Sequence, residues 1–178
     1  MNFQEKFQFC PVCGSKNFIK NNIKSKKCQD CGFVYYLNPS AATAVFIRNE
    51  QGELLVCRRV NNPAKGTLDL VGGFIDCDET AEQGIIREIK EETGLDVGTV
   101  RYLFSIPNDY LFSDLNIPTM DLFFETTVKK DVEIIPADDV SEAFFVPLKD
   151  VDYSLFGLKS IKKAVQFYLE SNQFNKTK

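Results

Sequence analysis

The chain carries two hydrophobic periods, one typical of strands and one typical of helices. A continuous apolar run rich in β-branched residues covers residues 41–48, and a second run covers residues 54–58 after a turn at residues 49–52. Two such runs joined by a short turn that contains Gly predict a β-hairpin. The segment of residues 106–118 contains two prolines and is predicted as a long loop. Further runs of strand-forming residues predict strands over residues 100–105, 120–129 and 143–146.

A helical period replaces the strand period over residues 81–93. Apolar side chains recur there every four residues, at Ala81, Ile85 and Ile89. Thr80 with Gln83 three residues later predicts a capping box, and Gly94 follows as a C-terminal stop signal. Residues 157–171 carry a second amphipathic pattern, which predicts a helix that covers the sheet. Its apolar face is made by Ile161, Ala164, Val165, Tyr168 and Leu169.

Three glutamates occupy another face of the first predicted helix. Glu88, Glu91 and Glu92 stand at i, i+3 and i+4, so their carboxylates converge within one turn. This arrangement destabilises an isolated helix, because Glu88 and Glu92 repel and all three lie near the negative end of the helix dipole. A solvated acidic face is one interpretation. A divalent cation site is the other, since hard cations prefer oxygen ligands.

The residues around these glutamates favour the cation site. The spacing of Gly73, Glu79, Arg87-Glu88-Ile89, Glu91-Glu92 and Gly94-Leu95 resembles the Nudix box. The resemblance covers the box directly and residues 41–150 more loosely. It implies an α/β protein with the Nudix fold, which is an α/β/α sandwich with a mixed sheet. It also implies hydrolysis of the diphosphate bond in a nucleoside diphosphate linked to another group, with Mg²⁺ or Mn²⁺ as cofactor.

The same resemblance implies roles for single residues. The metal ligands would be Glu88, Glu92 and the backbone carbonyl of Gly72, with Glu91 as a further ligand or the general base. The residues that brace the loop and the helix would be Arg87 and Glu79. A carboxylate just before the strand at residues 143–146 often completes the metal site in the family, and Asp139 is the candidate here, with Glu142 second. The chain contains no His, so a Ser-His-Asp triad is excluded.

Basic and polar side chains near the box are candidates for binding the substrate. Arg58, Arg59 and Lys65 flank the loop before the box, where they could contact phosphate. Ordinary solvation of that loop explains each of them equally well. Asn108 and Tyr110 lie in the predicted long loop, where they could hydrogen-bond to a base or stack on it, or pack locally.

Four cysteines near the N-terminus form two C-x-x-C motifs separated by 14 residues, each followed by Gly: Cys10, Cys13, Cys28 and Cys31. Four thiolates at this spacing are typical of a structural zinc ribbon, and each Gly permits a tight turn. A disulfide pair is disfavoured because the chain has the character of a cytosolic protein, and a redox C-x-x-C motif would not occur twice at this spacing. We predict a Zn²⁺-binding ribbon over residues 1–38 and a Nudix domain over residues 39–178.

Charge is distributed unevenly along the chain. The net charge is -4, yet residues 1–40 contain six lysines against two acidic residues. The lysines between the cysteine pairs have two interpretations. We favour balance of the formal charge of a zinc tetrathiolate together with solvation of a small surface. The alternative is contact with nucleic-acid phosphates. These lysines are Lys16, Lys20, Lys24, Lys26 and Lys27.

The sequence contains no candidate membrane segment. No apolar stretch approaches the ~20 residues of a membrane-spanning helix, and the first ten residues lack the basic head and apolar run of a secretory leader. A cytoplasmic protein without membrane contact is therefore expected. Analogy with relatives leaves a homodimer open. Cys57 and Cys77 stand outside the two motifs, and Cys57 is expected in the core because it lies in a predicted strand.

A zinc ribbon joined directly to a Nudix domain resembles the NADH pyrophosphatase group. That group carries Ser-Gln-Pro-Trp-Pro after the box, whereas this chain has Ser105-Ile106-Pro107 and contains no Trp. NADH or NAD⁺ and ADP-ribose are the expected substrates, and another nucleoside diphosphate derivative stays open. The alternative function is a nucleotide-sensing or RNA-contacting module with little or no hydrolysis. The intact glutamates of the box favour the enzyme.

Overall fold

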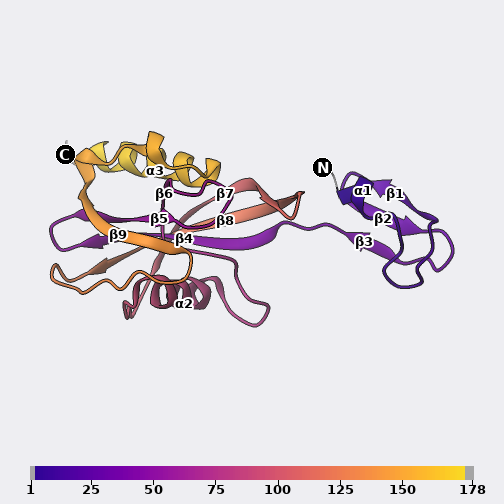
Figure 1. Ribbon diagram of the computed structural model, residues 1–178, viewed down its shortest axis with the longest axis horizontal. Coiled ribbons are helices and arrows are strands. Elements are labelled where there is room, and N and C mark those ends of the chain that lie inside the picture. The colour runs from indigo at the N-terminus through magenta and orange to yellow at the C-terminus, as the bar shows by residue number, and fades with distance from the viewer. Residues whose placement is uncertain (1–2, 175–178) are drawn as a thin grey trace. The chain divides into compact units, whose positions relative to one another are not determined.

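The computed structural model describes residues 3–174, and the chain divides into two compact units. The first unit comprises the residues up to 40 together with residues 109–119. The second unit comprises residues 41–108 and the residues from 120 onward. Figure 1 shows the elements of both units. Each unit has its own hydrophobic core, so each can be explained from its own residues.

The first unit is built around a small antiparallel sheet of three strands that pair in sequence order. The strands are β1 (Phe18–Asn22), β2 (Ser25–Cys28) and β3 (Val34–Tyr36), and the short helix α1 (Phe3–Lys6) precedes them. The core consists of Cys10, Phe18 and Cys28, against which Phe7, Phe33 and Tyr35 pack. So small a core is typical of units that a structural metal stabilises.

A six-stranded sheet forms the centre of the second unit. Its strands lie in the order β6-β5-β4-β8-β7, and β9 pairs antiparallel with β5. The strands are β4 (Ser40–Asn49), β5 (Glu53–Arg59), β6 (Leu68–Asp69), β7 (Arg101–Phe112), β8 (Leu115–Val128) and β9 (Val140–Pro147). The remaining elements are the helices α2 (Ala81–Thr93) and α3 (Lys159–Phe174) and the 3-10 turns η1 (Leu148–Asp150) and η2 (Tyr153–Leu155).

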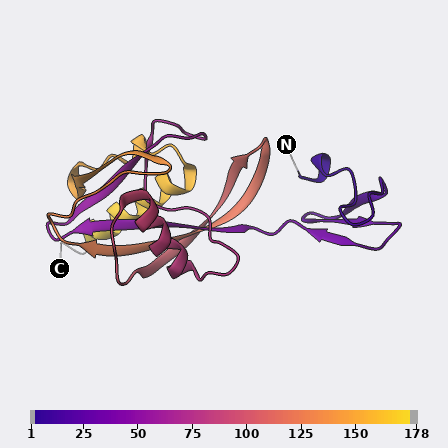
Figure 2. The ribbon, with the colours of Figure 1, turned by 60° about the horizontal axis from the view of Figure 1, so that its bottom comes forward.

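The helices α2 and α3 cover opposite faces of this sheet (Figures 1 and 2). Successive residues of β4 show how: Phe46 packs in the cluster that contains Val165 of α3, whereas Ile47 packs in the cluster that contains Ile89 of α2. Because both faces are covered, residues 43–47 are buried without interruption. The predicted α/β/α sandwich is confirmed.

The local signals placed most elements correctly. The helix predicted over residues 81–93 is α2, and the helix predicted over residues 157–171 is α3, which begins at Lys159. The predicted strands are present as β4, β5, β7, β8 and β9. Cys57 is buried in β5, as its apolar neighbours indicated. Within residues 3–174, no helix combines the length and the apolar character that crossing a bilayer requires.

The prediction of a long loop over residues 106–118 was wrong. These residues form the distal half of a hairpin between β7 and β8. Ser113 and Asp114 connect the strands, and both have positive φ, 49° and 58°, as a tight hairpin turn requires. The two prolines suggested a loop, but Pro107 lies in β7, the strand at the end of the sheet order, where proline is tolerated.

The stacked pair of Phe46 and Tyr168 provides a test of the core on the α3 face. The ring centroids are 3.9 Å apart, the planes differ by 7°, and Phe46 is fully buried. We expect Phe46→Ala to lower the free energy of unfolding by about 3–5 kcal/mol, because it leaves a cavity. Phe167→Ala, at a half-exposed position of α3, is the control and should cost far less. Chemical denaturation measures both, and equal losses would contradict this account.

Candidate active site

Local residues fix both ends of α2, the helix that carries the three glutamates. The N–H of Gln83 donates to the Thr80 hydroxyl over 3.2 Å, and the Thr80 N–H donates to the Gln83 side chain over 2.8 Å. The predicted capping box is therefore confirmed. Gly94 adopts φ 73°, and its N–H donates to the carbonyl of Lys90. The helix thus begins and ends where its sequence signals place it.

Arg87 connects the loop before α2 to the glutamates of the helix. Its guanidinium donates twice to Glu79, over 2.6 and 3.1 Å, and over 2.9 Å to each of Glu88 and Glu91. A fifth hydrogen bond goes to the carbonyl of Phe74. The hydrogen bonds from Arg87 lower the pKa of Glu79. Glu79 and Arg87 therefore hold the loop against the helix, the arrangement that their predicted bracing role requires.

Two of the three glutamates point into the protein rather than into solvent. Glu88 and Glu92 are buried, whereas Glu91 is exposed. Burial raises the pKa of Glu92 to about 9, although its carboxylate accepts a hydrogen bond from the N–H of Gly72 over 3.0 Å. Burial also raises the pKa of Glu88. Buried anions of this kind become stable when a cation neutralises them, so this donor set of oxygen atoms fits Mg²⁺ or Mn²⁺.

Glycines bring the backbone close to these carboxylates. A Cβ on Gly72 would lie 2.1 Å from the carbonyl oxygen of Thr43, and a Cβ on Gly73 would lie 2.4 Å from Glu88. The N–H of Thr43 donates to the carbonyl of Gly73, which fixes the loop on β4. In α2, a Cβ on Gly84 would lie 2.9 Å from Glu79. Sequence reasoning missed Gly84, because a glycine inside a helix gives no local indication that another side chain, here Glu79, packs against it.

The acidic segment after β8 returns to the C-terminal end of α2. The N–H groups of Ile135 and Ala137 donate to the carbonyls of Thr93 and Glu92, over 2.9 and 3.1 Å. This pairing satisfies helix carbonyls that have no partner within the helix. It also sets the next two residues beside the glutamates.

Asp138 and Asp139 follow that pairing directly. The negative charge of Asp138 contributes to the raised pKa of Glu88, and that of Asp139 contributes to the raised pKa of Glu92. The Asp139 carboxylate accepts a hydrogen bond from Asn61 over 2.6 Å. Asp138, which the sequence analysis did not select, adopts φ 51°. The adjacent acidic pair in the sequence was the available signal for it.

The arginines predicted to bind substrate are engaged within the protein. Arg58 donates to Glu142 over 2.9 Å and to the carbonyl of Gly66 over 2.9 Å. Glu142, the second candidate for the metal site, is thus an ion-pair partner in this structure. Arg59 pairs with the buried Asp69 and donates to the carbonyl of Pro63. Both arginines therefore shape the loop of residues 60–67.

The other residues predicted to contact substrate lie in different elements of the chain. Lys65 is exposed in the loop that the arginines shape. Asn108 lies in β7 and donates to Asp121 over 3.2 Å. Tyr110 belongs to the hairpin tip, which groups with the first unit.

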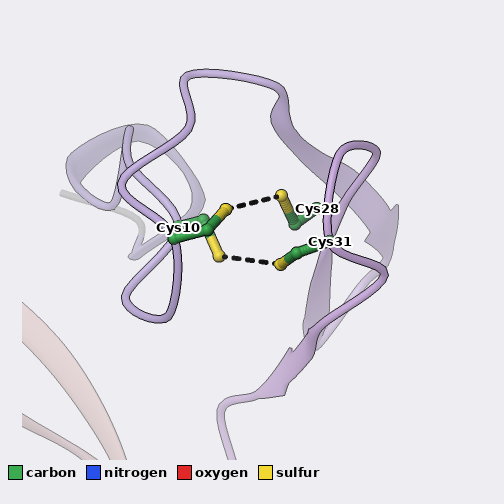
Figure 3. A group of neighbouring side chains, drawn as sticks. Cys10, Cys28 and Cys31 are labelled. Carbon is green, nitrogen blue, oxygen red and sulfur yellow. Dashed lines mark hydrogen bonds between the residues drawn. The ribbon is translucent and has the colours of Figure 1, made fainter.

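The four cysteines of the first unit form the other candidate metal centre. Their sulfur atoms all lie within 4.8 Å of one another, which is the only set of three or more potential metal ligands so close within residues 3–174 (Figure 3). The two motifs fold alike, because the N–H groups of Gly14 and Gly32 donate to the carbonyls of Cys10 and Cys28. The backbone N–H of Cys31 lowers the pKa of Cys28 to about 7. Four converging thiols with a stabilised thiolate fit Zn²⁺.

One of the five lysines between the cysteine pairs is not a surface residue. Lys26 is buried, and its ammonium group donates to the carbonyls of Gln4 and Phe7. It also lies over the ring of Phe18, 5.0 Å from the centroid. Lys26 is therefore a structural residue that neither solvates the surface nor reaches a phosphate.

The close approach at Gly72 provides a test of the loop. We expect Gly72→Ala to lower the free energy of unfolding by about 1–3 kcal/mol, because the new methyl group collides with the backbone of Thr43. Gly98→Ala is the matched control, since a Cβ there meets no atom within 4 Å. Denaturant unfolding of both variants measures the difference. A Gly72→Ala protein as stable as Gly98→Ala would contradict the loop geometry.

Comparison with known proteins places this site in a family. The ADP-ribose pyrophosphatase of Methanocaldococcus jannaschii is 33% identical over 150 residues, which are 83% of this chain and 84% of that protein. The NAD-capped RNA hydrolase NudC of Vibrio atlanticus is 34% identical over 103 residues, 58% of this chain and 38% of that protein. The match thus spans about two fifths of the NudC relative.

A solved structure and a family model agree with these relatives. The crystal structure of a NUDIX hydrolase from Nitrosomonas europaea superposes with a TM-score of 0.71 at 22% identity, covering 94% of this chain and 93% of that one. The family model for the NUDIX domain matches residues 38–166. The chain therefore belongs to the Nudix family.

Proposed function

We propose that this protein is a divalent-metal-dependent pyrophosphohydrolase that cleaves the diphosphate bond of a nucleoside diphosphate derivative. The observation that carries the proposal is the burial of Glu88 and Glu92 beside a glycine loop, braced by Arg87. A structural acidic face would leave these carboxylates in solvent. Their burial is costly unless a cation shares the site.

The side chains divide the work of hydrolysis between them. Glu88 and Glu92 would hold the ion together with the carbonyl of Gly72, and a bound Mg²⁺ or Mn²⁺ would supply the positive charge that neutralises the diphosphate oxygens. Arg87 orients Glu88 and Glu91 through direct hydrogen bonds. The exposed Glu91 is a further ligand or takes the proton from the attacking water.

Asp139 is the proposed further carboxylate ligand. Its charge acts on Glu92, and Asn61 holds its carboxylate. Asp138 is the alternative for this position, because its charge acts on Glu88. Lys65 is an exposed cation that precedes the glycine loop at Gly72 and Gly73 in the sequence, and it is the candidate for contact with phosphate.

ADP-ribose is the first substrate to test. The archaeal relative named ADP-ribose pyrophosphatase matches this chain over most of both proteins, whereas the NudC match covers a minor part of that relative. NADH and NAD⁺ follow, on the resemblance to the ribbon-bearing group. The residues Ser105-Ile106-Pro107, which lie in β7, differ from the Ser-Gln-Pro-Trp-Pro signature that distinguishes that group.

Substitution of one buried glutamate tests the enzyme directly. We expect Glu92→Gln to lower kcat for ADP-ribose with Mg²⁺ at least about 100-fold, because loss of a ligand removes several kcal/mol of charge stabilisation. Glu82→Gln, on the exposed first turn of the same helix, is the matched control and should retain wild-type turnover. AMP release measures both variants, and near-normal turnover by Glu92→Gln would refute the assignment.

Metal analysis tests the ribbon separately. We expect about one zinc per chain in purified protein, since four thiolates form a closed tetrahedral site. Cys28→Ser should lose most of this zinc and unfold the first unit, because the metal stabilises a core of few apolar residues. Cys77→Ser, at an exposed position outside the tetrad, is the control. Full zinc content in Cys28→Ser would contradict the proposed site.

A further inference from the structure

The first unit contains a groove that the proposed hydrolysis does not use. Its volume is about 330 Å³, which lies within the range of about 300–1,000 Å³ that is usual for ligand sites. Most of its lining is aromatic or apolar, and a basic residue, Lys6, stands at its edge. The apolar lining residues are Phe7, Phe9, Pro11, Phe18 and Tyr35.

One ring in this groove has no role in the core. Phe18 is 3% exposed, and Phe7 and Tyr35 pack edge to face with centroids 5.7 Å apart. These three side chains form the floor. Phe9 is 53% exposed and lies outside the core cluster. An exposed phenylalanine at the edge of an aromatic groove offers its face for stacking.

Two lysines lie near the groove, on the face of the small sheet that carries Phe18. The ammonium group of Lys16 lies 5.7 Å from the centre of the Phe9 ring. Lys20 pairs with Lys26 across β1 and β2, and paired residues share a face of a sheet. Since Lys26 lies over Phe18, Lys20 is on the groove side. Lys27 is one residue further along β2 and therefore on the other face.

The buried Lys26 explains how the groove is formed. Its hydrogen bonds to the carbonyls of Gln4 and Phe7 draw the segment after α1 against β2. That segment supplies one wall of the groove. Lys6 is also engaged, because it donates to the carbonyl of Ser113 over 3.0 Å. The cations left to meet a ligand are the exposed Lys16 and Lys20.

We infer that this groove binds single-stranded nucleic acid, with a base stacked on Phe9 and the neighbouring phosphates beside Lys16 and Lys20. The combination of a stacking ring with flanking cations is the one that binds such strands without strict sequence preference. An apolar peptide would gain nothing from the lysines. The excess of lysine over acidic residues in residues 1–40 attracts a polyanion as well.

Binding of a labelled oligonucleotide tests this inference. The probe is a 12-nucleotide single strand with a 5′-hydroxyl, as RNA and as DNA, followed by fluorescence anisotropy at several salt concentrations. Such a probe has no diphosphate bond, so the result is independent of the proposed hydrolysis. We expect saturable binding, and we expect Phe9→Ala to weaken it about 5- to 150-fold.

The lysines distinguish a groove from general charge attraction. Lys20→Gln should lower the slope of log affinity against log salt by about 0.7, the value for one lost phosphate contact on a single strand. Lys27→Gln removes the same charge from the other face and should leave the slope unchanged. Equal effects of the two variants would overturn the inference, and so would an absence of binding to both RNA and DNA.

A mononucleotide probe and a conservative variant serve as further controls for binding of a strand in the groove. AMP alone should bind far more weakly than the strand, and an equal affinity would overturn contact with a chain of phosphates. Phe9→Tyr keeps a ring for stacking and should bind as the wild type does. Zinc content and ADP-ribose turnover, measured on every variant, should match the wild type, since none of these residues belongs to either metal site.

Discussion

The contact of one guanidinium with three carboxylates is the interaction on which the candidate site depends. Arg87 holds Glu79 in the loop and Glu88 and Glu91 in the helix at the same time. Without it, the acids on this face of α2 would repel one another, and the loop would lack its main polar link to the helix. With it, the carboxylates of Glu88 and Glu92 lie beside the glycine loop, where a cation can balance their negative charge.

The sandwich allows this concentration of charge by covering it. Ile85 and Ile89 anchor α2 on the sheet through the same core that contains Ile47 of β4. The rotation of the helix is thereby fixed, and Glu88 and Glu92 are carried to the edge of the covered area, where they are buried but stay within reach of the loop. A helix whose apolar stripe was turned by one residue would place these acids in solvent instead.

The parts of the site that were predictable from the sequence are those encoded within a few residues. The caps of α2, the spacing of its glutamates and the two cysteine motifs all have local signatures, and the structure contains each of them. The distal half of the β7–β8 hairpin, residues 106–118, was missed because this segment contains two prolines and its turn, Ser113-Asp114, lacks the glycine that usually reveals such turns.

Contacts between residues far apart in the chain could not be predicted from local sequence signals. The sequence does not reveal the ion pairs that Arg58 and Arg59 make with Glu142 of β9 and the buried Asp69 of β6, and contact of these arginines with phosphate stays a prediction. Lys26 looked like a surface lysine for the same reason, since the carbonyls that receive it lie about twenty residues away. The sequence shows which side chains are charged, but it does not show which groups pair with them in the folded protein.

The pairing of Ile135 and Ala137 with the end of α2 separates two kinds of position in the segment between β8 and β9. The residues just before Ile135 are held by the side chains of Val132 and Ile134, which pack against the core, rather than by that pairing, so their number is freer to change over evolutionary time. From Ile135 to Asp139, every residue is held in register with the helix, and a single insertion would shift both aspartates by one place. Relatives should therefore differ in length on one side of Ile135 and keep a constant length on the other.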